Sequence, residues 1–166
     1  GRANLEWVYP PLNASYHEQA NTLAAVAWTH LKCAENKMFH PIRGLRWPGR
    51  MQEVASRNRP DLTFVLEGAH NPSGMKAACD ELMQQAQWSR PWALLLGTSP
   101  QTNMRGMLEP LANLCTRHAP SAVVLTEPQF GRYPGVDVAT LRSDVERLGV
   151  PVSAAFPMPD DAVGWL

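Results

Sequence analysis

The stretch FVLEGAHNPSGMKAACDEL, residues 64–82, joins an apolar run to a helical pattern. The run ends in Glu67, and the segment Gly-Ala-His-Asn-Pro then leads into apolar side chains at helical spacing. Asn71 is a good N-cap, and Pro72 suits the first position of a helix. The stretch therefore predicts a strand, a tight turn that Gly68 permits, and a helix that begins directly after Asn71.

The same order of strand and helix recurs along the chain. Continuous apolar runs begin at Leu62, Trp92, Ser121 and Pro151, about thirty residues apart, which is the size of one strand-plus-helix unit. Between them lie three apolar stripes at helical spacing, within residues 75–86, 104–115 and 138–148. Runs that do not alternate are typical of strands buried on both faces, so we predict an α/β fold with a doubly wound, mostly parallel, Rossmann-like sheet.

Three parts are expected along the chain: residues 1–35 as the last helix and tail of a preceding domain, 36–45 as a linker, and 46–166 as the α/β domain, cut before its closing strand. The first part carries a capping-box pattern from Ser15 to Glu18, followed by an amphipathic stretch. Proline and glycine interrupt the pattern in the second part. Near the end, Pro159 has the pattern of a helix start.

Composition narrows the class of protein. The 166 residues have a formal net charge of zero and no basic patch, which disfavours nucleic acid and anionic membranes as partners. No stretch approaches the roughly 18 to 20 apolar residues of a membrane span. The three cysteines, Cys33, Cys79 and Cys115, are odd in number and far apart. They favour buried thiols in a reducing, cytoplasmic compartment over disulfides or zinc.

The joint at residues 67–72 has the features of a ligand site. In an open parallel sheet, ligands bind where the carboxyl ends of strands lead into helix N-termini. A helix N-terminus favours an anion, and a carboxylate such as that of Glu67 suits ribose hydroxyls. The alternative is ordinary capping by Asn71 with a solvated His70, and spacing alone leaves both interpretations open.

Two motifs together resemble a known family. RWPGRMQEV, residues 46–54, followed by LEGAHNPSGMKAACDEL, residues 66–82, resembles the C-terminal domain of folylpolyglutamate synthase and dihydrofolate synthase, in the Mur ligase superfamily. HEQANTLAAVA, residues 17–27, is similar to the helix that closes the central ATPase domain of that family. The resemblance implies a cytoplasmic, ATP-dependent ligase of folate biosynthesis and one-carbon metabolism. Such an enzyme joins L-glutamate to folate or dihydropteroate through an acyl phosphate.

The resemblance also implies roles for particular residues. Asn21 and Arg50 would contact ATP, and Glu67 would stand near the ribose with His70 beside it. An arginine suits such a place because its planar cation can neutralise phosphate or stack on a purine. Loop and cap support would come from Gly68, Asn71 and Pro72. No catalytic residue and no metal ligand is expected in this chain, since the phosphate loop and the Mg²⁺ ligands would lie in the preceding ATPase domain.

Two lookalike motifs are set aside. GLRWPGRM, residues 44–51, has the glycine spacing of a phosphate loop but offers Arg-Met where Lys-Ser/Thr is required. HEQAN begins like a zinc-protease helix but places Asn21 where the second histidine belongs. Without a phosphate loop, we expect the chain by itself to be inactive. For Trp47 two roles stay open: a packing anchor, or a residue that lines the nucleotide site.

The chain also departs from the family pattern. Glu67 replaces the usual aspartate, and GTSPQTNM stands at residues 97–104 where the family often has Asp-Lys-Asp. These departures keep a second hypothesis open, a diverged and non-catalytic Mur-ligase-like binding module. A third hypothesis, a ligase that acts on peptidoglycan or polypeptide precursors, is disfavoured by the Trp-Pro-Gly-Arg segment.

Overall fold

The computed structural model describes residues 16–30, 47–57, 59–84, 90–131 and 133–166. The chain divides into two compact units, residues 1–68 and 69–166, which are described separately here. Ser15 of the capping pattern and the expected linker lie outside the described residues. The domain boundaries expected at residues 35 and 46 therefore stay a prediction.

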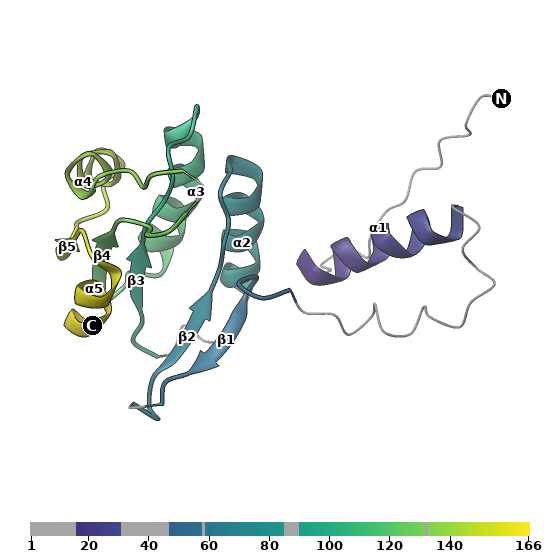
Figure 1. The fold of residues 1–166 in the computed structure, drawn as a ribbon, viewed down its shortest axis with the longest axis horizontal. Coiled ribbons are helices and arrows are strands. Elements are labelled where there is room, and N and C mark those ends of the chain that lie inside the picture. The colour runs from purple at the N-terminus through teal and green to yellow at the C-terminus, as the bar shows by residue number, and fades with distance from the viewer. Residues whose placement is uncertain (1–15, 31–46, 58, 85–89, 132) are drawn as a thin grey trace. The chain divides into compact units, whose positions relative to one another are not determined.

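The described residues of the first unit form a helix and a β-hairpin (Figure 1). The helix is α1 (Tyr16–His30), and the strands are β1 (Gln52–Ala55) and β2 (Thr63–Leu66). The strands pair antiparallel, with Gln52 opposite Leu66 and Ala55 opposite Thr63. The apolar run that begins at Leu62 was expected in the parallel sheet, and this expectation is wrong. A short loop can join antiparallel neighbours, whereas a parallel pair needs a long crossover.

The loop of the hairpin carries its own polar contacts. Ser56 N donates to Leu62 O at 3.0 Å, and Leu62 N donates to Arg59 O at 2.9 Å. The Arg59 guanidinium meets the Asp61 carboxylate through Nε–Oδ1 at 3.2 Å and Nη2–Oδ2 at 3.1 Å. Both side chains are exposed, so solvent weakens this ion pair.

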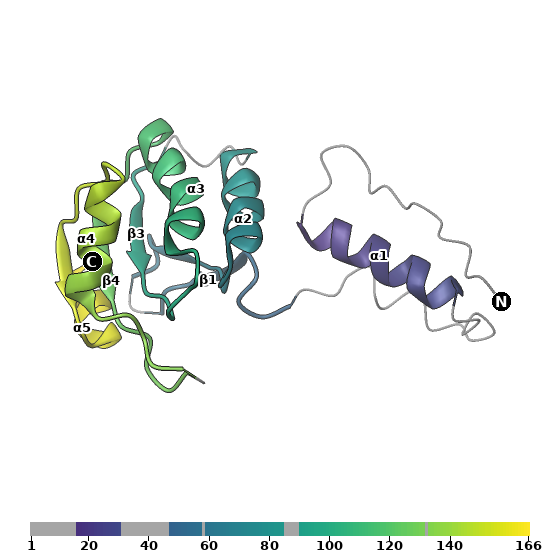
Figure 2. The ribbon, with the colours of Figure 1, turned by 90° about the horizontal axis from the view of Figure 1, so that it is seen from above.

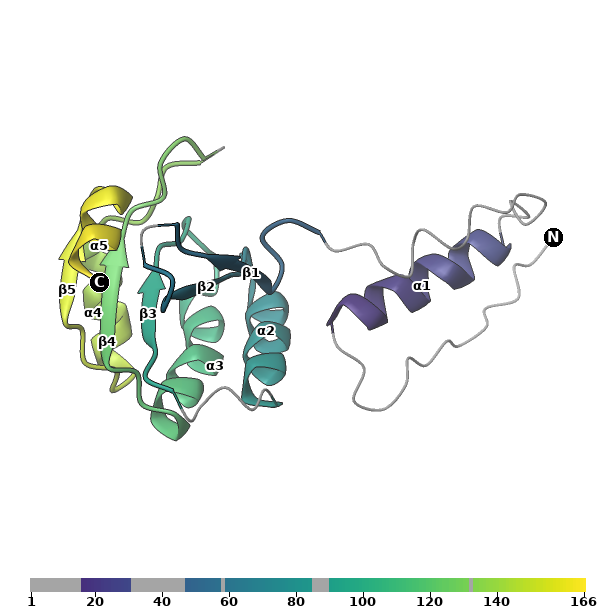
Figure 3. The same ribbon diagram turned by 90° about the horizontal axis from the view of Figure 1, so that it is seen from below.

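The second unit contains the parallel sheet that the sequence predicts. Its strands are β3 (Ala93–Leu96), β4 (Ala122–Thr126) and β5 (Ala154–Phe156), in the order β3-β4-β5. Both pairs are parallel, with Leu96 opposite Leu125 and Thr126 opposite Phe156. The helices are α2 (Pro72–Gln84), α3 (Met104–Arg117), α4 (Val138–Arg147) and α5 (Pro159–Trp165). Helices flank this sheet: in this unit α3 and α4 lie in front of the strands in Figure 2 and behind them in Figure 3.

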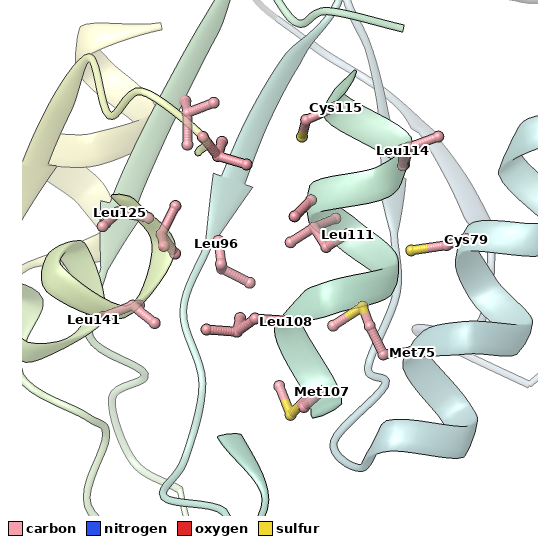
Figure 4. Close-up of a cluster of buried hydrophobic side chains, with 14 of the residues drawn as sticks. Met75, Cys79, Leu96, Met107, Leu108, Leu111, Leu114, Cys115, Leu125 and Leu141 are labelled. Atoms are coloured by element: carbon pink, nitrogen blue, oxygen red, sulfur yellow. The ribbon is translucent and has the colours of Figure 1, made fainter. Parts of the chain in front are cut away.

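Helix α3 forms the centre of the core because it has apolar residues on two sides. In Figure 4, Met75 and Cys79 of α2 point toward α3, while Leu111 of α3 lies on the side of Leu96 in β3. The completely buried side chains in this unit include Leu114, Leu125 and Leu141. Burial of each such side chain stabilises the fold by about 1.5–3 kcal/mol relative to exposure.

Polar caps fix where two of these helices begin. Asn103 Oδ1 accepts from Gly106 N at 2.9 Å ahead of α3, and Asp137 Oδ1 accepts from Thr140 N at 2.9 Å ahead of α4. The Thr140 backbone N–H holds the pKa of the Asp137 carboxyl below its ordinary value. Each cap satisfies a backbone donor that the helix leaves without a partner.

Candidate functional site

A tight turn precedes the hairpin and is formed by Trp47, Pro48, Gly49 and Arg50. Arg50 N donates to Trp47 O at 3.2 Å, which closes the turn. Proline at the second position and glycine with φ +70° at the third are the residues that a type II turn requires. Met51 follows with φ +45° and a buried side chain. A positive φ is uncommon for a bulky residue, so this backbone must be held by its neighbours.

Glu67, which follows β2 directly, holds this turn with both oxygens of its carboxylate. Oε1 accepts from Arg50 Nη1 at 2.7 Å, and Oε2 accepts from Met51 N at 2.9 Å. The side chains of Arg50 and Glu67 are only 23% and 17% exposed. Hydrogen bonds that involve charged groups are shorter and stronger than neutral ones, and this pair is largely shielded from water.

Gly68 ties the end of β2 to the same turn through its backbone. Gly68 N donates to Gly49 O at 2.7 Å, and a Cβ added at position 68 would lie 3.3 Å from that oxygen. The positive φ values of this region belong to Gly49 and Met51 rather than to Gly68. Glycine at 68 thus suits the close approach of two backbone segments, whereas its φ is not positive, so the left-handed turn expected there is not found.

Asn71 and Pro72 start α2 in the second unit. Asn71 Oδ1 accepts from Gly74 N at 2.8 Å and from the Ser73 hydroxyl at 2.9 Å, and Pro72 is the first helical residue. The side chain of His70, directly before this cap, is exposed. The Asn71 cap and the absence of an N–H on Pro72 use up most of the donors of the first turn, so the positive dipole end of α2 is what favours negative charge here.

The structure brings together two of the four residues expected to contact the nucleotide. Arg50 and Glu67 form the ion pair described above. Asn21 is half-buried in α1, and His70 belongs to the second unit, so their positions around the pair stay predictions. Trp47 is 67% exposed and is therefore not a packing anchor within the described structure.

Sequence reasoning missed the backbone part of this arrangement. The N–H of Met51 donates to the Glu67 carboxylate, and the carbonyl of Gly49 accepts from the N–H of Gly68. A signal for it was present, because Pro-Gly at 48–49 predicts a turn with a positive φ. What the sequence could not give was the partner, which lies 16 residues further along the chain.

Other features of the described residues do not form a second site. Burial raises the pKa of the Cys115 thiol to about 11, so it is protonated at neutral pH and a poor nucleophile. The small pocket beside it is lined otherwise by apolar side chains, which cannot orient a polar substrate. Within the described ranges, no three His, Cys, Asp or Glu side chains gather to hold a metal ion. The helices described there also include none with the length and apolar character to cross a membrane.

Comparison with known families identifies the domain. Residues 49–165 match the family model described as Mur ligase, glutamate ligase domain. The chain belongs to this family. The matched region of this Mur ligase domain includes Arg50, Glu67 and His70, whereas Asn21 lies outside it.

Solved structures agree with this assignment at the level of the fold. The domain is similar to Mycobacterium tuberculosis folylpolyglutamate synthase complexed with ADP and AMPPCP, with a TM-score of 0.67 and 23% identity. A second structure of that synthase, complexed with ADP, gives a TM-score of 0.70 and 22% identity. Both matches cover 95% of this chain but only 34% and 33% of the synthase chains, so the sequence spans about a third of their length. No curated protein matches the chain.

Proposed function

We propose that this Mur ligase domain belongs to a cytoplasmic, ATP-dependent ligase that joins L-glutamate to folate or dihydropteroate. The reaction would proceed through an acyl phosphate, which the amine of glutamate attacks. The family assignment supports a ligase, and the synthase structures in complex with ADP and AMPPCP support nucleotide binding. The paired motifs at residues 46–54 and 66–82 support folate as the substrate class.

One observation carries the proposal for this chain: the Arg50 guanidinium is held by Glu67 beside a hydrogen-bonded turn. Phosphoryl transfer depends mostly on positioning and on the neutralisation of phosphate charge. A guanidinium held in one place can do both without acting as a base. In this proposal Arg50 contacts the nucleotide, with Asn21, Glu67 and His70 as further residues of the same site.

The proposal assigns no catalytic residue to the chain and no Mg²⁺ ligand. The phosphate loop and the Mg²⁺ ligands would belong to the ATPase domain that precedes this one in the proposed ligase. The contribution of this chain is to bind and orient the nucleotide, and to cover the reacting groups from water.

The test is Arg50→Ala in the full ligase, assayed for folate elongation with ATP and glutamate. We expect kcat/KM for ATP to fall at least tenfold, since a shielded charged contact contributes about 1.5–3 kcal/mol. Arg59→Ala is the matched control because it removes an exposed arginine of the same hairpin. Equal activity of wild type and Arg50→Ala would show that the role given to Arg50 is wrong.

A second candidate function is a non-catalytic binding module that keeps the fold and has lost its nucleotide contact. The observation in its favour is that the Glu67 carboxylate already has a partner on each oxygen. Glu67→Asp separates the two functions. A large gain in ATP affinity would favour the degenerate module, and normal activity of the unaltered ligase without such a gain would dismiss it.

A further inference from the structure

We propose that Glu67 is a positioning residue, which orients the Arg50 guanidinium and the Met51 backbone and does not contact the nucleotide sugar itself. This inference rests on the proposed function, because it states how the chain holds the cation of the nucleotide site. It assigns Glu67 a role different from the ribose contact that the family resemblance implies for the acid at this position.

The hydrogen-bond geometry divides the carboxylate between a side chain and the backbone. One oxygen accepts from Arg50 Nη1 at 2.7 Å and the other from Met51 N at 2.9 Å. Two successive residues are thus fixed by one side chain that is 17% exposed. A carboxylate bound in this way is a strong constraint on the direction of Arg50, because any movement of the guanidinium breaks a charge-assisted bond.

The length of the side chain matters for this geometry. A shorter aspartate would draw the carboxylate back by about 1.5 Å, the length of one C–C bond. Both contacts are at ordinary hydrogen-bond distance, so a retreat of that size breaks at least one of them unless the backbone moves. The backbone of Gly68 is itself bound to Gly49 at 2.7 Å, which leaves little room for such movement.

The conformation of Met51 makes the constraint consequential. Its φ of +45° is unfavourable for a residue with a long side chain, and its N–H bond to Glu67 helps to hold it. Arg50 is the last residue of the turn that its N–H closes on Trp47 O, and it directly precedes Met51. The carboxylate therefore fixes both the backbone from which the guanidinium projects and the guanidinium itself.

The first experiment uses NMR of arginine side chains in the full ligase without nucleotide. Wild type should show a slowly exchanging guanidinium signal from Arg50, which Glu67→Gln and Glu67→Asp should lose. Asp61→Asn, which removes an exposed acid of the same hairpin, should leave the Arg50 signal in place. An unchanged Arg50 signal in Glu67→Asp and Glu67→Gln would overturn the positioning role.

The second experiment is a double-mutant cycle on ATP affinity, measured by calorimetry. Glu67→Gln and Arg50→Ala should each weaken binding about tenfold, and the double variant should bind no worse than Arg50→Ala alone. If Glu67 instead touches the sugar directly, the losses should multiply, and that result would reject the proposal.

Sugar-modified nucleotides provide a third readout that a purely structural loss of folding does not move. The ratio of affinities for ATP and 3′-deoxy-ATP should be the same in wild type, Glu67→Gln and Glu67→Asp. If the variants bind ATP and 3′-deoxy-ATP equally well while wild type prefers ATP, Glu67 contacts the ribose and its positioning role is rejected. Thermal unfolding of each variant verifies that it is folded. If Glu67→Gln does not fold, the comparison is made with Glu67→Asp alone.

Failure of this inference is distinguishable from failure of the proposed function. If Arg50→Ala binds ATP as wild type does, the nucleotide site has been assigned wrongly. Both the proposed role of Arg50 and the positioning role of Glu67 are then rejected. If Arg50→Ala is weak and the double variant is weaker still, the nucleotide site stands and only the division of roles between Arg50 and Glu67 is wrong.

Discussion

The hairpin of the first unit and the sheet of the second are held together by different forces. Among the residues of the first unit whose burial is described, Met51 is the only buried apolar side chain, and Val54, Val65 and Leu66 are exposed. The second unit has a continuous apolar core in which Leu114, Leu125 and Leu141 have no exposed surface. Stability in one region therefore depends on directed polar contacts, and in the other on burial.

The contrast explains where a functional group can be placed. A core that excludes water fixes its side chains by packing and has no room for a ligand. A polar turn such as residues 47–51 can present a charged group because its constraints are hydrogen bonds from Glu67 and Gly68.

The largest effect is expected from one substitution made in both regions. Leu125→Ala in β4 should lower the free energy of unfolding by about 2–5 kcal/mol, because it leaves a cavity at a fully buried site. Leu66→Ala in β2 should cost less than about 1 kcal/mol, because that side chain is 44% exposed. Urea denaturation measures both. Equal costs would contradict the idea that burial contributes more to the sheet of the second unit than to the hairpin of the first.

A smaller effect is expected at two glycines that both have a positive φ. Gly49 has φ +70° and Gly149 has φ +82°, and neither would bring a Cβ against another atom. Alanine at either position should cost about 1 kcal/mol of stability, because a left-handed conformation strains a side chain. Gly49→Ala alone should also weaken ATP binding by the full ligase.

Gly164→Ala provides the control for this pair. Gly164 lies in α5 without a positive φ and with open space around it, so alanine should not destabilise the domain. Equal losses of ATP affinity in Gly49→Ala and Gly149→Ala would show that the turn has no special part in binding.

The smallest effect is expected from two exposed carboxyls, one in each region. Their pKa values are lowered, that of Asp61 by the Arg59 side chain and that of Asp137 by the Thr140 backbone N–H. A lowered folded-state pKa contributes stability above the unfolded value of about 3.9, and this is lost as the pH falls through the folded value. Urea denaturation between pH 2 and 6 measures this loss. The free energy of unfolding should fall less steeply with decreasing pH in Asp61→Asn and in Asp137→Asn than in wild type.

Salt separates these two carboxyls. Added salt should reduce the contribution of Asp61, which depends on an exposed ion pair, more than that of Asp137, which accepts from a backbone N–H. The same salt dependence for both variants would contradict this assignment of causes.

Much of the second unit could be predicted from the sequence because its signals are local. The run from Ser121 gives the buried strand β4, and the stripe within residues 104–115 gives α3, whose apolar residues face the core. Continuous apolar character is a sound sign of a parallel strand when both faces are covered. Pro159 likewise marks the start of α5, as its pattern predicts.

The hairpin was harder to predict because its signals are weak and its contacts distant. Strand β1 has only four residues, Gln-Glu-Val-Ala, and all are exposed, so no period reveals a buried face. Without that partner, the direction of β2 could not be deduced. The ion pair of Arg50 with Glu67 joins residues 17 positions apart, and residue type alone does not place them side by side.

The reach of Glu67 has a consequence for how this sequence can change over generations. The single substitution Glu67→Asp should remove at least one of the two hydrogen bonds that Glu67 accepts, from Arg50 and from Met51. In this chain the backbone around residues 48–51 would have to shift for an aspartate to keep both contacts, since Met51 supplies the second donor. A chain with aspartate at this position would therefore hold the turn that precedes β1 by a different set of contacts.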